Sequence, residues 1–69
     1  MSDEEFRDLA AFELPYSRKA QLREVTFDSG MKMLRLILRE GRRITQIDLD
    51  PENAREMSAL MSDWAEKNE

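Results

Sequence analysis

Two glycines, Gly30 and Gly41, are the feature that most constrains how this chain of 69 residues can fold. They end the short polar segments Asp28-Ser29-Gly30 and Glu40-Gly41, and the stretches on either side of both segments are rich in β-branched or long apolar residues. Glycine tolerates the positive φ angles that tight β-turns need, and strands joined by such turns are antiparallel. The pattern therefore predicts a three-stranded antiparallel β-meander, with strands over about residues 18–27, 31–39 and 42–49.

The same turns predict which residues lie opposite each other. A two-residue Glu40-Gly41 loop places Arg39 opposite Arg42 and Ile37 opposite Ile44. A two-residue Ser29-Gly30 loop places Val25 opposite Leu34, whereas a three-residue loop with a glycine bulge turns Val25 toward Met33. The first strand's facing depends on this choice. With the two-residue loops, the predicted core face consists of Val25, Phe27, Leu34, Leu36, Leu38, Ile47 and Leu49.

An amphipathic helix is predicted over about residues 51–66. Asp50 is a suitable N-cap, and Pro51 suits the first helical position because its missing N–H needs no partner there. We expect the apolar stripe of this helix to lie across the core face of the sheet. The stripe consists of Ala54, Met57, Leu60, Met61, Trp64 and Ala65.

The first 17 residues form an acidic segment, distinct from the domain predicted over residues 18–69. Ser2 and Glu5 match a capping box, which leaves two alternatives for residues 3–11: a short helix or a frayed tail. Pro15 ends any such helix near Leu14, and an extended connector is expected over Phe12 to Tyr16. The predicted fold class is α+β: a three-stranded antiparallel β-meander packed by one C-terminal amphipathic helix, with a possible short N-terminal helix.

The composition argues against an enzyme and against a metal site. The chain has no Cys and no His, which removes the usual zinc ligands and most activated nucleophiles. Asp48, Asp50 and Glu52 alternate near a strand end and carry oxygens that suit Mg²⁺ or Ca²⁺, but capping already accounts for Asp50. We therefore expect no catalytic residue, no metal and no cofactor.

The composition also bears on location. A chain without Cys fits a reducing compartment, and the acidic start of the sequence is unlike the basic start of a secretory signal. No apolar run reaches the roughly 18 residues of a membrane span. We expect a cytoplasmic protein that has no membrane partner.

A second apolar surface is predicted on the sheet face opposite the core. A chain this short buries little core, and without disulfides or zinc its usual reinforcement is association with another chain. The predicted function is a non-catalytic interaction or accessory module that binds itself or a larger protein, homodimeric through this face or through an edge strand. The candidate interface residues are Leu22, Met31, Met33, Ile37 and Ile44.

The charge layout supports an alternative function. The chain has a net charge of -4, yet residues 18–43 contain eight basic and three acidic residues. A basic centre of this kind is typical of phosphate contacts, which weaken as salt rises. The alternative is a small nucleic-acid-binding regulator, with Arg18, Lys19, Arg23, Arg35, Arg39, Arg42 and Arg43 as the candidate polyanion contacts.

The run GRRITQIDLDPENAREM, residues 41–57, contains a glycine, a basic pair, a strand, Asp-Pro-Glu and a helix. It resembles the end of the single-stranded-DNA-binding transcriptional coactivators, which are dimers. The resemblance implies a dimeric sheet followed by a helix. That family has four strands where three are predicted here, and it has an aromatic platform that the predicted outer face lacks, so no site residue is carried over.

Overall fold

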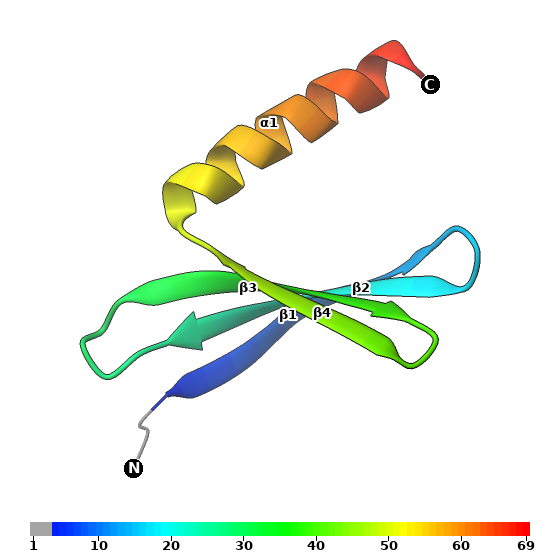
Figure 1. Cartoon of the computed structure of the whole chain (residues 1–69). Coiled ribbons are helices and arrows are strands. Elements are labelled where there is room, and N and C mark those ends of the chain that lie inside the picture. Colours follow the sequence, from blue (N-terminus) through cyan, green and yellow to red (C-terminus); the bar gives the residue numbers. More distant parts are fainter. Residues whose placement is uncertain (1–3) are drawn as a thin grey trace.

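The chain forms one antiparallel sheet followed by one helix in a computed structural model that describes residues 4–69 (Figure 1). The elements are β1 (Glu5–Leu14), β2 (Arg18–Thr26), β3 (Lys32–Glu40), β4 (Arg43–Leu49) and α1 (Pro51–Lys67). The strands lie in the sheet in their sequence order. The α+β class, the antiparallel sheet and the C-terminal helix are confirmed, but the predicted number of strands was wrong, because the sheet has four.

The additional strand is β1, which occupies the segment where a short helix or a frayed tail was predicted. β1 pairs with β2 from Glu5 opposite Thr26 to Leu14 opposite Arg18. A bulge between Asp8 and Ala10 shifts the register. The extra residue changes the spacing of the apolar residues from the period of two of a strand to one that imitates a helix, which is why a helix was one prediction. Residues 5–14 form a strand instead of an N-terminal helix. Ser2, its predicted cap, lies outside the described residues.

The β3–β4 turn lies one residue later than predicted, which changes the pairing of β3 with β4 by two residues. Glu40 pairs with Arg43, so the loop is Gly41-Arg42, and Gly41 takes the positive φ of 61° at the first loop position. Arg39 therefore lies opposite Ile44, and Ile37 lies opposite Gln46, rather than opposite Arg42 and Ile44. Because side chains alternate with a period of two, this shift leaves every residue of β3 and β4 on its predicted face.

The β2–β3 turn follows the three-residue alternative. The Phe27 N–H donates to the Met31 carbonyl at 2.9 Å, and Gly30 has a φ of 89°. Val25 lies opposite Met33, so the preferred pairing with Leu34 was wrong. A one-residue change in the pairing register turns every side chain of β2 to the opposite face of the sheet. Leu22 therefore lies on the same face as Leu36, and Val25 lies on the other face.

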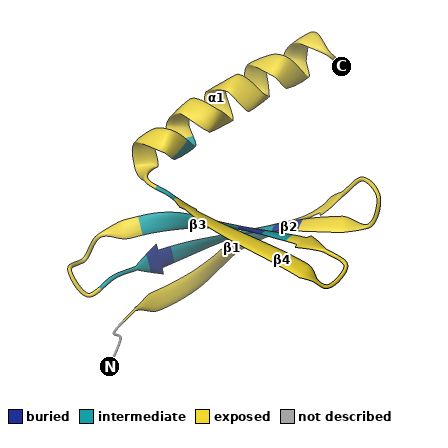
Figure 2. Ribbon diagram, viewed as in Figure 1, coloured by how far each residue is buried: buried dark blue, intermediate teal, exposed yellow. Residues whose placement is uncertain are grey.

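Cross-strand partners define the two faces of the sheet. The face beneath α1, called the helix-side face, carries an apolar band of Ala10, Phe12, Ala20, Leu22, Leu34, Leu36, Leu38, Ile47 and Leu49. The opposite face carries Val25 and Ile37, which are 0% and 1% exposed. Val25 lies between Phe6 and Met33, and Ile37 lies between Gln21 and Gln46, whose hydrocarbon stems can cover it. Figure 2 shows that burial is concentrated in the two central strands.

The predicted helix is confirmed at its expected place in the sequence, but it does not pack across the sheet as predicted. α1 contacts only β3 and β4, and none of its residues is buried. Only Asp50 separates Leu49, the end of β4, from Pro51, the start of α1. One connecting residue cannot fold a helix flat onto the strand before it, and Figure 1 shows α1 rising away from the sheet.

Candidate protein-interaction surface

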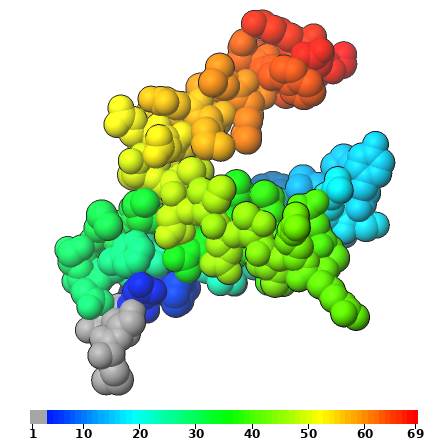
Figure 3. Space-filling model, in the orientation of Figure 1, coloured from blue at the N-terminus to red at the C-terminus, as the bar shows by residue number. Residues whose placement is uncertain are grey.

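A groove of about 320 Å³ lies between α1 and the helix-side face. Figure 3 shows it as the hollow between the helix and the sheet. Apart from Ser58, every side chain that lines it is apolar, so it offers shape and apolar area rather than groups for acid–base or nucleophilic chemistry. The lining residues are Phe12, Leu22, Leu34, Leu36, Leu49, Ala54, Met57, Ser58 and Met61.

The apolar surface continues along α1 beyond the groove. Leu60, Met61, Trp64 and Ala65 line a second, shallower depression, and Met61 belongs to both. Leu60 is 71% exposed, Met61 61% and Trp64 68%. Side chains of this size are normally covered when they lie next to one another, so the outer part of α1 is an unpartnered apolar stripe.

Charged residues lie at both ends of the helix-side face. Arg18 Nε lies 2.8 Å from Glu40 Oε2 at one end. At the other end, Glu24 is approached by Arg7 at 3.5 Å and by Lys32 at 3.8 Å. An apolar centre with a polar rim is the usual anatomy of a protein–protein interface.

The opposite face holds a row of four charges, one on each strand. Arg23 and Arg35 are cross-strand neighbours, and each is paired with a carboxylate on an edge strand. Arg23 Nε lies 2.6 Å from Asp8 Oδ1, and Arg35 contacts both oxygens of Asp48, at 2.8 and 3.1 Å. The hydrogen bond from Arg35 holds the pKa of Asp48 below its usual range. This face therefore neutralises its central cations internally.

The predicted interface residues do not share one surface. Leu22 lines the groove, whereas Met33, Ile37 and Ile44 lie on the opposite face and Met31 lies in the β2–β3 turn. Ile37 is 1% exposed. Sequence reasoning assigned the α1 stripe to the core instead, because apolar spacing on a helix does not reveal whether its own sheet or another chain covers it.

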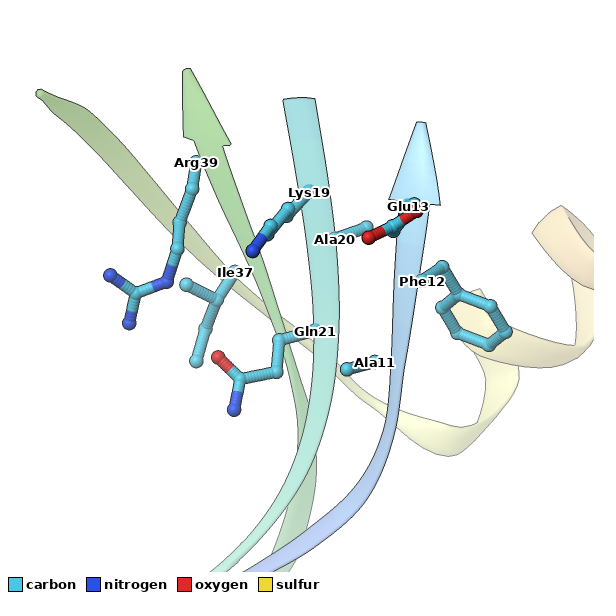
Figure 4. A pocket seen from close by; sticks show the side chains of 8 residues that line it. All are labelled: Ala11, Phe12, Glu13, Lys19, Ala20, Gln21, Ile37 and Arg39. Carbon is cyan, nitrogen blue, oxygen red and sulfur yellow. The ribbon is translucent and has the colours of Figure 1, made fainter. Parts of the chain in front are cut away.

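The predicted polyanion contacts divide into two groups. Arg18, Arg23 and Arg35 form ion pairs within the chain. Lys19 and Arg39 face each other across β2 and β3 and line a depression of about 210 Å³ with Gln21 and Ile37. Figure 4 shows these four side chains on one side of the sheet and Phe12 on the other. Within residues 4–69, the second group, Lys19, Arg39, Arg42 and Arg43, forms no ion pair.

The acidic residues near the end of β4 already have partners. Asp48 binds Arg35, and the Asp50 carboxylate accepts a hydrogen bond from the Asn53 N–H at 2.7 Å. Among residues 4–69, no group of three Asp, Glu, His or Cys side chains could hold a metal ion. In the same part of the chain, no helix has the length and apolar character needed to cross a membrane.

Comparison with known proteins places the chain in a family but not beside a characterised relative. Neither the curated proteins nor the solved structures contain a match to it. The model of DUF6967, a family of unknown function, matches residues 3–67, and the chain therefore belongs to that family.

Proposed function

We propose that this protein is a non-catalytic interaction module that binds another polypeptide through the groove and the adjoining stripe of α1. The exposure of Leu60, Met61 and Trp64 beside an apolar groove carries the proposal. An apolar surface rimmed by charges favours a protein partner, because binding removes that surface from water. The interface then differs from the predicted one, of which only Leu22 lines the groove.

Two further features support this function. The groove side chains include no titratable group, which favours binding over catalysis. The chain lacks cysteine, so it needs no oxidising compartment, and we propose the cytoplasm as its location.

Two methionines of the chain provide the test. Met61 lies in the groove and is 61% exposed, and Met31 lies in the β2–β3 turn and is 56% exposed. In an extract of the expressing cells, hydrogen peroxide should oxidise Met61 several-fold more slowly than Met31, because a partner covers the groove. Peptide mass spectrometry measures both rates in one sample, and the urea-unfolded chain supplies their intrinsic ratio. Equal protection of the two residues would refute the proposal.

Nucleic-acid binding remains a second candidate because of the pair Lys19 and Arg39. Like charges directly opposite each other on a sheet are destabilising. Glu13 lies opposite Lys19 on its other side, whereas Arg39 has Ile44 there, so an anion bound beside Arg39 would remove the remaining repulsion. Arg42 lies in the adjoining β3–β4 turn, whereas Arg43 lies opposite Glu40 on the other face of the sheet. The sheet also has four strands, so the difference in strand number from the DNA-binding coactivators is removed.

Fluorescence anisotropy with a labelled single-stranded oligonucleotide tests this candidate. Binding should weaken steeply between about 50 and 200 mM salt, and Arg39→Gln should lower the slope of log affinity against log salt by about one. Arg55→Gln, on the outside of α1, is the control and should leave the slope unchanged. No binding at the lower salt concentration eliminates nucleic acid as the ligand.

A further inference from the structure

We infer that α1 of a second copy of this chain fills the groove, and that the two copies exchange their helices reciprocally. The inference rests on the proposed function, because it names the partner of the same surface. Four observations support it: the total exposed area, the shape of the groove, the character of the residues that would enter it and the condition of the sheet edges.

The exposed area is too large for a folded single chain. The chain has a mass of 8.2 kDa and exposes 5935 Å², whereas a folded monomer of this mass exposes about 4,500 Å². Its radius of gyration is 13.9 Å, against about 11 Å for a compact domain of this length. The excess of about 1,400 Å² exceeds the roughly 800 Å² that each partner loses in a standard stable interface. A second copy would bury it.

The groove requires an elongated apolar occupant. One wall is an apolar sheet face and the other an apolar helix face, so the volume of about 320 Å³ suits large apolar side chains that project from a second helix, and the 17 residues of α1 span about 25 Å. Each copy has one apolar helix stripe that its own sheet leaves uncovered and one sheet face that its own helix leaves uncovered. In a dimer, the helix stripe of each copy would cover the sheet face of the other, and this reciprocal contact closes around a two-fold axis.

The side chains suit such an exchange. Met57 and Met61 line the groove, and methionine adapts its shape to an incoming group. Trp64 and Leu60 of the second copy supply large apolar groups, and tryptophan is among the commonest anchors of protein interfaces. The charged pairs at the two ends of the helix-side face would remain at the rim of the contact, where they stay in water.

Pairing through the sheet edges is the less favourable way to join two copies. β1 is bulged between Asp8 and Ala10 and carries Glu5, Asp8 and Glu13. Bulges and charges are the features that prevent edge strands from pairing with other chains. β4, the other edge, has seven residues. The helix-side face therefore offers the larger and less obstructed surface.

The test is sedimentation equilibrium of the purified full chain. We expect twice the mass of 8.2 kDa, with Leu60→Glu raising the dimer dissociation constant by about 100-fold or more. Met31→Glu is the matched control, because Met31 is similarly exposed but lies in the β2–β3 turn. It should change the constant by no more than about twofold. A monomer at every concentration, or a dimer sensitive to Met31→Glu but not to Leu60→Glu, would overturn the inference.

Oxidation of the purified wild-type chain tests this inference separately from the proposed function. It needs no variant, so it distinguishes the two even if Leu60→Glu fails to fold. Slower oxidation of Met61 than of Met31 in the purified chain supports the second copy as occupant. Protection of Met61 in cell extract but not in the purified chain overturns this inference and leaves the proposed function standing. Protection in neither sample overturns both.

Discussion

Arg35 shows at the scale of one residue how register decides a role. The predicted β3–β4 register places it opposite Gln46 and leaves its charge available for a polyanion. The observed register places it opposite Asp48, where its guanidinium makes a two-point contact and its side chain is only 20% exposed. Residue type and facing were predictable, but the partner was not. A one-residue shift of the loop changes the pairing register by two, which preserves the face while changing every neighbour.

The Arg35–Asp48 pair predicts a specific dependence of stability on pH. The pKa of Asp48 is lower in the folded chain than its unfolded value of about 3.9, so the pair stabilises the fold above that pH. This contribution is lost as the pH falls through the lowered folded pKa. Asp48→Asn should therefore reduce the free energy of unfolding by about 1 kcal/mol at pH 7 and by much less near pH 2.

Urea unfolding at the two pH values measures the difference. Asp63→Asn is the control, since Asp63 and Lys67 form an exposed i,i+4 pair at 3.0 Å that contributes little. A gap between wild type and Asp48→Asn that stays constant from pH 7 to pH 2 would show that the ion pair is not its cause.

At the scale of elements, α1 is defined by local interactions rather than by packing. Asp50 caps its first turn, Pro51 occupies the first helical position and Lys67 pairs with Asp63 in its last turn. These signals lie within a few residues of one another, so the sequence predicted the helix to within one residue at its C-terminal end. They carry no information about the surface that covers the helix, which is why its expected position across the sheet was wrong.

Because packing contributes so little within one copy, the N-cap of α1 should matter more than usual. Asp50→Ala should cost about 1 kcal/mol and lower the helical signal in circular dichroism, since the Asn53 N–H loses its acceptor. Asp50→Asn keeps an acceptor at the same position and should behave like wild type. Equal signals for the two variants would mean that other contacts hold the first turn.

At the scale of the whole molecule, the structure is a single sheet whose apolar band faces an almost detached helix. Only Ala20, Val25 and Ile37 are buried among residues 4–69. So small a core contributes little free energy to offset the conformational entropy lost when most of the residues become ordered. This shortage is the reason for expecting that a second chain completes the fold. The sequence predicted the shortage of core, but the inverted facing of β2 separates Leu22 from the other residues of the predicted interface, such as Met33 and Ile37.

A fold completed by a second copy should melt at a temperature that depends on concentration. Mass action favours the folded dimer as the protein concentration rises, so a tenfold increase should raise Tm by about 4 °C. Leu60→Glu should melt at a lower temperature that is independent of concentration. Differential scanning calorimetry at two concentrations measures both, and a constant wild-type Tm would contradict a dimeric fold.

The sequence by itself determined the features that a few neighbouring residues control: the turns at Gly30 and Gly41, the capped helix after Asp50 and the alternation of β3 and β4. The tertiary structure decided that residues 5–14 form a strand, which face Leu22 occupies and where α1 lies relative to the sheet. These depend on hydrogen bonds and contacts between distant segments. A bulge or a loop longer by one residue costs little locally, but it inverts the facing of a whole strand.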